Sequence, residues 1–162
     1  MLELSRRGFI AFGLMAGLSA CGEFAPSTLT PAVDATPESM LAAINAARRQ
    51  YGARPLVWSA ALTRMARLQA GDMVVHDQMS HNFGPGLDLR SRATMADVHG
   101  PVGENVAAGQ TSVEETLNAW LNSPGHRFTL LSDMWTGVGM AVQSGRSGSK
   151  YGIFWAADFG NA

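Results

Sequence analysis

The sequence predicts an α+β domain in which helices pack on a small antiparallel sheet. Three observations support this fold class: apolar residues recur at helical spacing in the first half of the chain, a capping box opens another helix near residue 112, and two strand-like segments end the chain. With 46% hydrophobic and 15% charged residues, the composition is that of a globular protein. We therefore expect one domain in which the helices come first and most of the sheet comes last.

The first two helices are predicted from their capping residues. Thr36-Pro37-Glu38 combines a cap, a proline and an acid at the start of an apolar pattern with helical spacing, and Gly52 ends that pattern. A short extended connection over 54–58 leads to Ser59, which caps the second helix. Its apolar face extends towards His76, which we interpret as a helix-end histidine and not as a ligand.

The remaining elements follow from turn residues, one capping box and period-two alternation. Ser112 and Glu115 have the spacing of a capping box, and Gly103 and Gly109 bound an apolar run that predicts a buried strand. The predicted elements are a short helix over 87–93, a strand over 104–108, a helix from 113, a helical segment over 127–131, and a terminal hairpin of strands 135–143 and 151–159.

The amino terminus, residues 1–21, is predicted to be an export signal. Arg6-Arg7 precedes an apolar run too short to span a bilayer, and the surrounding residues resemble a twin-arginine signal, with the general secretory route as the alternative. Leu18-Ser19-Ala20-Cys21 resembles a bacterial lipobox, in which the cysteine carries a diacylglycerol. Cys21 is the only cysteine, which excludes a disulfide within the chain. We expect lipidation of Cys21; the alternative is an ordinary signal peptide with a chance cysteine.

The chain is thus divided into the signal, a flexible tether over 22–35 and a folded domain over 36–162. The tether contains Pro26, Ser27, Thr28, Thr30 and Pro31 with little apolar periodicity, and we expect it to join the domain to a membrane of the bacterial cell envelope. A formal net charge of −1 and the absence of a basic patch exclude nucleic acid as a partner. The arginines from Arg48 to Arg127 are scattered, and we interpret them as a solvated surface. A monomer is expected.

Three short motifs predict a small polar site. His81, Glu104 and His126 each lie beside a turn-forming residue, in a chain with only four histidines. Two imidazoles and a carboxylate are groups from which a binding or catalytic site is built. No nucleophile is evident, because Ser80 and Ser123 are so close in sequence to their histidines that attack geometry is not expected.

The motifs, taken in order, resemble the CAP superfamily of cysteine-rich secretory proteins, antigen 5 and plant pathogenesis-related-1 proteins, in its bacterial SCP-like branch. The resemblance covers roughly residues 37–160, nearly all of the predicted domain. The residues that carry it are Asn45-x-x-Arg48, Pro55-Leu56-x-Trp58, Ala70-x-Asp72-Met73, Ser80-His81, Gly103-Glu104-Asn105-Val106-Ala107-x-Gly109, Trp120-x-Asn122-Ser123-Pro124-Gly125-His126-Arg127 and Phe159-Gly160.

The resemblance implies a three-layer α-β-α sandwich with a cleft that two histidines and two glutamates line in eukaryotic members. His81, Glu104 and His126 match three of these four positions. At the fourth, three residues after a tryptophan, this chain has Ser123. A Zn²⁺ or another divalent cation is the cofactor to consider, and the missing carboxylate would weaken its binding.

Three functions remain open from the sequence. The preferred one is a cleft that binds a small molecule, lipid, peptide or peptidoglycan fragment without turnover. The second is a metal-assisted hydrolase of the cell envelope, whose catalytic residues are not identified. The third is a scaffold in which hydrogen bonds merely satisfy Glu104 and in which the Asn105 amide ties neighbouring loops together.

Overall fold

The structure is a computed structural model that describes residues 35–161. The predicted export signal, Cys21 and all of the predicted tether except Ala35 lie outside these residues. The elements, in chain order, are α1 (Pro37–Gln50), β1 (Val57–Trp58), α2 (Ala60–His76), α3 (Leu89–Met95), β2 (Gly103–Ala108), α4 (Val113–Asn122), α5 (Pro124–Leu131), β3 (Gly137–Ser144) and β4 (Ile153–Gly160). Within residues 35–161, none of the helices has the length and hydrophobicity needed to cross a bilayer.

The strands form one four-stranded sheet in the order β1-β3-β4-β2. β4 pairs antiparallel with both β3 and β2, and its pairing with β3 is the predicted terminal hairpin. The expectation of a purely antiparallel sheet is wrong at one edge, because β1 pairs parallel with β3 at Gly137 and Val138. With only two residues, β1 is too short to show the alternation by which strands are identified in sequence.

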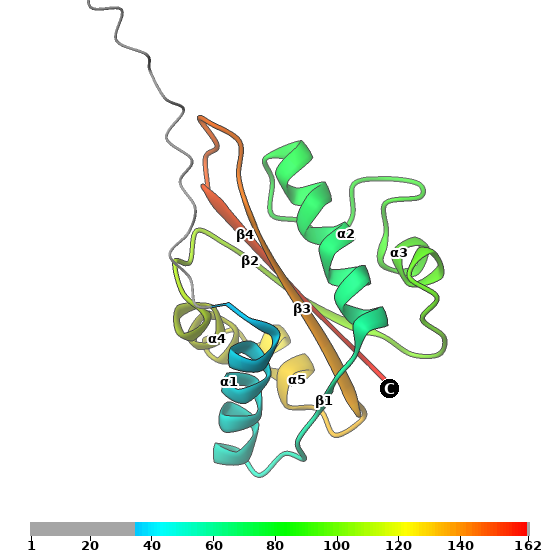
Figure 1. The fold of residues 1–162 in the computed structure, drawn as a ribbon, viewed down its shortest axis with the longest axis vertical. Helices are drawn as coiled ribbons and strands as arrows, with labels where there is room; N and C mark the ends of the chain where they lie inside the picture. The colour runs from blue at the N-terminus through cyan, green and yellow to red at the C-terminus, as the bar shows by residue number, and fades with distance from the viewer. Residues whose placement is uncertain (1–34, 162) are drawn as a thin grey trace, which may run out of the picture.

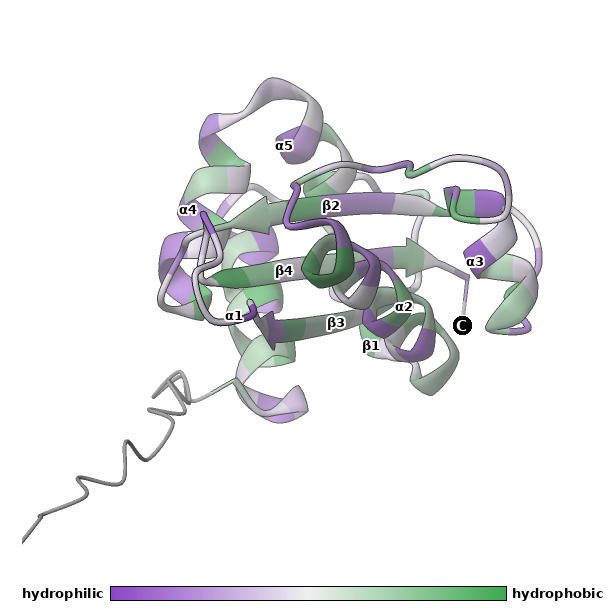
Figure 2. Ribbon diagram, turned by 90° about the horizontal axis from the view of Figure 1, so that it is seen from above, coloured by the Kyte–Doolittle hydropathy of each residue, from purple (hydrophilic) through white to green (hydrophobic). Residues whose placement is uncertain are grey.

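Helices cover both faces of this sheet, so the molecule has three layers (Figure 1). α2 and α3 lie on one side, and α1, α4 and α5 lie on the other (Figures 1 and 2). Consecutive strand residues pack on opposite faces of the sheet. Phe154, Ala156 and Ala141 pack with α2, whereas Trp155, Ala157 and Met140 pack with α1 and α4.

The predicted caps begin the helices. The side-chain oxygens of Thr36, Ser59 and Ser112 accept hydrogen bonds from backbone amides three residues on, at 3.1, 3.4 and 3.1 Å. The short third helix begins later than expected, because Asp88 is its cap and accepts a hydrogen bond from the Ser91 amide at 2.8 Å.

Two contacts fix the helices against the sheet. At Gly139 of β3, a Cβ would lie 2.0 Å from the Thr63 nitrogen, so α2 packs directly on the strand. On the other face, Arg48 of α1 is fully buried and donates to the Leu130 carbonyl oxygen at 2.6 Å, which ties α1 to α5. The interpretation of Arg48 as a solvated side chain is therefore wrong.

Candidate functional site

The predicted site residues meet around β2, which is an edge strand of the sheet. His81 comes from the loop after α2, Glu104 from the start of β2, and His126 from the first turn of α5. The imidazole rings of His81 and His126 have centroids 6.2 Å apart and planes tilted by 35°. The structure thus brings the three predicted residues together from both faces of the sheet.

The direction of side chains along β2 explains this meeting. Consecutive strand residues point to opposite faces, and Val106 packs against the α2 side while Ala107 packs against the α4 side. Glu104 therefore points towards α2 and α3, and Asn105 points towards α5. Figure 2 shows the hydrophilic stretch of β2 that contrasts with the hydrophobic middle of the sheet.

Glu104 is buried, and both of its carboxylate oxygens have charged or ionisable partners. Its side chain is 1% exposed, whereas the His81 side chain is 54% exposed. The Oε1 atom lies 2.8 Å from Nδ1 of His81, and the Oε2 atom accepts from Nη2 of Arg92 at 2.8 Å. A buried carboxylate is costly without such partners, so this pairing is what makes the buried position stable.

Arg92 of α3 is the main residue of the site that the sequence did not identify. Its side chain is fully buried, and it also donates to the carbonyl oxygens of Leu87 at 2.8 Å and His81 at 3.0 Å. Arg92 therefore holds the backbone of the His81 loop as well as the Glu104 carboxylate. The interpretation of Arg92 as a solvated residue is wrong, and no sequence signal separates it from Arg90, which is exposed.

His126 is half-buried and contacts Ser123. Its Nδ1 atom lies 2.9 Å from the Ser123 Oγ atom, so these sequence neighbours are within hydrogen-bond distance. The reason is that Ser123 occupies the N-cap position of α5 without a side-chain capping hydrogen bond, and this position lies one helical turn from the third residue of the helix. Burial, and to a smaller extent the nearby His81, lowers the pKa of His126 below its ordinary value. The lowered pKa favours the neutral form of the His126 ring.

Asn105 connects β2 to α5. It is fully buried, and its Nδ2 atom donates to the His126 carbonyl oxygen at 2.9 Å. The Asn105 amide therefore links the edge strand to the first turn of α5.

Asp158 of β4 is a second buried carboxyl group beside the site. It is the register partner of Glu104, and within residues 35–161 neither of its carboxyl oxygens has a hydrogen-bond partner. Burial, followed by the charge of Glu104, raises the pKa of Asp158 well above its ordinary value, and Arg92 opposes that rise. One carboxyl group in an otherwise apolar strand is a signal that the sequence analysis missed.

The donor atoms do not fit a metal site with three or more protein ligands. Among the described residues, no group of at least three His, Cys, Asp or Glu side chains is arranged to hold a metal ion. Glu104, the carboxylate expected to complete a metal coordination shell, is already bound by Arg92 and His81.

His76, interpreted as a helix-end residue, stacks on Phe83 with ring centroids 4.5 Å apart.

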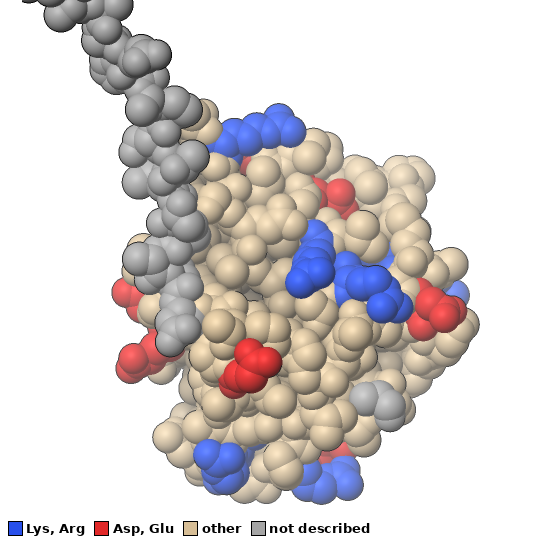
Figure 3. Space-filling model, in the orientation of Figure 1, with Lys and Arg blue, Asp and Glu red and all other residues tan. Residues whose placement is uncertain are grey.

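Several hollows lie elsewhere on the described surface, and other residues line them. One is a groove of about 290 Å³ between α1, α2 and β3. Others, of about 500 and 450 Å³, lie beside α3 and beside α5. On the face shown in Figure 3, basic and acidic side chains are dispersed and form no patch of one sign.

Proteins similar to this chain in sequence or structure include bacterial ones. The chain is 33% identical over 117 residues to the uncharacterized protein YkwD of Bacillus subtilis strain 168, an alignment that covers 70% of this chain and 45% of YkwD. An extracellular protein of Bacillus anthracis that contains an SCP domain aligns with a TM-score of 0.66 and 27% identity, over 77% of this chain and 40% of the other. The chain thus spans less than half the length of these two relatives.

An outer surface protein of Borrelia burgdorferi has the same fold, with a TM-score of 0.67 and 21% identity over 76% of this chain and 90% of that protein. The sequence also matches a protein family as a whole. Residues 41–159 match the cysteine-rich secretory protein family, CAP, which is most of the described domain. The chain belongs to the CAP family of cysteine-rich secretory proteins, as the ordered motifs predict.

Proposed function

We propose that this protein is an exported CAP-domain binding protein, in which the site of His81, Glu104 and His126 binds a small polar ligand without turning it over. One observation carries the proposal. The only carboxylate among the three residues is buried and bound on both oxygens, so its role is to position His81. A group that is held in this way is not free to act as a general base.

The ligand would meet the two imidazoles. Glu104 orients the ring of His81 through Nδ1 and leaves Nε2 for a ligand, since the two ring nitrogens are distinct. The Nδ1 atom of His126 contacts Ser123, so its Nε2 atom is the ring nitrogen left for a ligand. Such a pair suits the amide and hydroxyl groups of a peptide or a peptidoglycan fragment, which are ligands available outside the cytoplasm.

Zinc is a weaker candidate partner of the same site. With Glu104 engaged, only the two imidazoles remain as ligands, and structural and catalytic zinc sites use three or four protein ligands. We expect Zn²⁺ to bind poorly, and no step of the proposed function depends on it.

A hydrolase is the second candidate, and the contact between Ser123 and His126 is the observation that favours it. A serine 2.9 Å from an imidazole nitrogen is the first half of a nucleophile and base pair. The second half is a group that orients the base, and here the nearby carboxylate contacts His81 instead. We therefore place binding ahead of catalysis.

Export and anchoring complete the proposal. The Bacillus anthracis relative is described as extracellular and the Borrelia burgdorferi relative as an outer surface protein. Together with the signal pattern over 1–21, these descriptions support export, and the lipobox pattern supports a lipid anchor on Cys21. Mass spectrometry of the membrane fraction should find acylated Cys21, and an unmodified soluble product that begins elsewhere would contradict the anchor.

The binding proposal is tested with soluble muropeptides and the chain that begins at Gly22. We expect the imidazole NMR signals of His81 and His126 to shift on titration, and the binding to be lost in a His81→Ala/His126→Ala double variant. The matched control is His99→Ala, because His99 is exposed and its imidazole contacts Asp97, which is not one of the site residues. No shift with muropeptides, or equal binding by the double variant, would contradict the proposal. Labelling of Ser123 by a fluorophosphonate, together with turnover that Ser123→Ala abolishes, would establish the hydrolase.

A further inference from the structure

Asp72 of α2 lies under the loop that follows this helix, beside the polar site. Gln69, Asp72 and His76 occupy positions i, i+3 and i+7 and therefore share one face of α2. The Gln69 side chain donates to the Ser80 carbonyl oxygen, and the His76 ring stacks on Phe83 with centroids 4.5 Å apart. The loop thus turns back along this face of the helix (Figure 1), and Asp72 lies between its two contact points.

The Arg92 guanidinium brings Asp72 close to Glu104 and to the backbone of His81. Its Nη2 atom donates to the Glu104 carboxylate at 2.8 Å and to the His81 carbonyl oxygen at 3.0 Å. Its Nη1 atom lies 3.9 Å from Oδ2 of Asp72. The Asp72 side chain is 22% exposed and that of Glu104 is 1% exposed. Two carboxylates therefore share one guanidinium, and Asp72 is the one that a ligand can reach.

Asp72 lacks the partners that other aspartates of the domain have. Asp77, Asp88 and Asp133 each accept a hydrogen bond from a backbone amide, at 3.0, 2.8 and 2.8 Å. Within residues 35–161, the Asp72 carboxylate accepts no hydrogen bond, because its distance of 3.9 Å to the nearest guanidinium nitrogen is too long for one. The fold therefore does not use this carboxylate as a cap or a tie.

The polar atoms without partners on this face of α2 are acceptors. Gln69 is fully buried, and among the described residues its Oε1 atom has no hydrogen-bond partner. Burial, followed by the charge of Glu104, raises the pKa of Asp72 above its ordinary value, and Arg92 and His76 oppose that rise. The negative charge of Asp72 is thus incompletely compensated, and a group that carries positive charge and donates hydrogen bonds would stabilise it.

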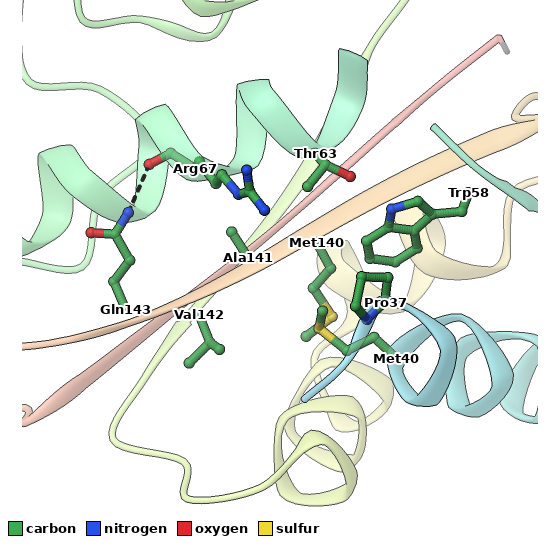
Figure 4. Close-up of a pocket in the computed structure, with 9 residues that line it drawn as sticks. All are labelled: Pro37, Met40, Trp58, Thr63, Arg67, Met140, Ala141, Val142 and Gln143. Carbon is green, nitrogen blue, oxygen red and sulfur yellow. Dashed lines mark hydrogen bonds between the residues drawn. The ribbon is translucent and has the colours of Figure 1, made fainter. Parts of the chain in front are cut away.

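We propose that the ligand of this site carries a primary amine, which Asp72 binds as an ammonium group beside His81. An ammonium group has three donors and no acceptor, so it suits a carboxylate next to an unpartnered amide oxygen. The groove at the other edge of the sheet has no counterpart, because its lining contains Arg67 and no carboxylate (Figure 4). This proposal rests on the proposed function in one respect, namely that the amine belongs to the ligand that meets His81 and His126.

The test is a titration of the protein with cadaverine, a primary diamine, followed at the carboxyl carbons by NMR. We expect Asp72 to respond at a concentration at least about tenfold lower than Asp97, because Asp97 is 85% exposed and exposed ion pairs contribute little. The neutral analogue 1,5-pentanediol should leave the Asp72 signal unchanged. No response of Asp72, a response to the diol, or equal responses of Asp72 and Asp97 would each overturn the proposal.

Asp72→Asn removes the charge and keeps the shape of the side chain. In this variant the shifts that cadaverine causes in the backbone amides of residues 81–83 should need at least about tenfold more diamine, because a charge-assisted hydrogen bond is lost. The matched control is Asp97→Asn, which should respond like the unaltered protein. An unchanged response of the Asp72 variant would contradict the role given to this carboxylate.

Muropeptides separate this proposal from the ligand-binding proposal. Soluble muropeptides are compared with the same preparation after N-acetylation of its amino groups, at the imidazole signals of His81 and His126. We expect acetylation to weaken binding at least about tenfold. Equal binding of both preparations would overturn the amine proposal and leave the proposed function intact. If neither preparation binds while cadaverine still shifts Asp72, the peptidoglycan ligand is wrong and the amine site stands.

Discussion

The two edges of the sheet differ in how their backbone and polar groups are covered. At the β2 edge, buried polar groups are paired across three elements: Arg92 of α3 and His81 bind Glu104, and the Trp120 indole donates to the Val106 carbonyl oxygen at 2.9 Å. At the other edge, β1 covers only two residues of β3 and leaves a groove lined by apolar side chains together with polar ones such as Arg67 and Gln143. The first edge is thus closed by paired polar groups, whereas at the second the backbone of β3 beyond Val138 has no partner among the described strands.

Arg92 is the residue whose loss should most affect the polar edge. Arg92→Ala leaves the buried Glu104 with His81 alone, and breaking a buried ion pair costs about 3–5 kcal/mol. We expect a loss of that size in the free energy of unfolding, measured with urea. The matched control is Arg90→Ala on the same helix, where the exposed side chain predicts a change within about 0.5 kcal/mol. Equal effects of the two substitutions would contradict the role given to Arg92.

Trp120 tests whether α4 closes the β2 edge through one hydrogen bond. Trp120→Phe keeps an aromatic ring but leaves the Val106 carbonyl oxygen without its partner, at a cost of about 1–3 kcal/mol. Exchange of the β2 amides should become faster while the β3 amides keep their rates. Uniform acceleration in both strands would show that Trp120 contributes through general packing and not at this edge.

Asp158 should make stability depend on pH. Because the pKa of Asp158 is raised in the folded protein, the folded chain keeps a proton that the unfolded chain releases near pH 3.8. Stability from this group is therefore complete below that pH and is lost as the pH rises towards the folded pKa. Asp158→Asn should flatten this fall in a series of unfolding midpoints, and an unchanged pH profile would exclude a protonated Asp158.

The smallest expected effect is at His126. Its lowered pKa means that stability from the neutral ring is complete above about pH 6.5 and is lost as the pH falls through the folded pKa. NMR titration of the ring should give a pKa below 6.5, its ordinary value. His81→Ala removes the smaller of the two causes, so it should raise the pKa of His126 slightly and leave it below that of an exposed histidine.

The sequence predicted the helices well, because caps such as Thr36 and Ser112 are local signals that act within one helical turn. The parallel pairing of β1 was missed, because two residues carry no period. In the site, His81, Glu104 and His126 were found from their motifs. Arg92 was not found, because its burial depends on how α3 packs against β2, which Arg90 and Arg92 do not reveal in sequence.

The most direct measurement for the central claim is a zinc titration of the chain that begins at Gly22. Binding is measured by calorimetry and by the imidazole NMR signals of His81 and His126. If Arg92 and His81 occupy Glu104, the chain and its His81→Ala/His126→Ala variant should bind Zn²⁺ equally poorly. Tight binding of one equivalent that the double variant loses would show that Glu104 is released to the metal, and it would contradict the account of a site built for ligand binding without a metal.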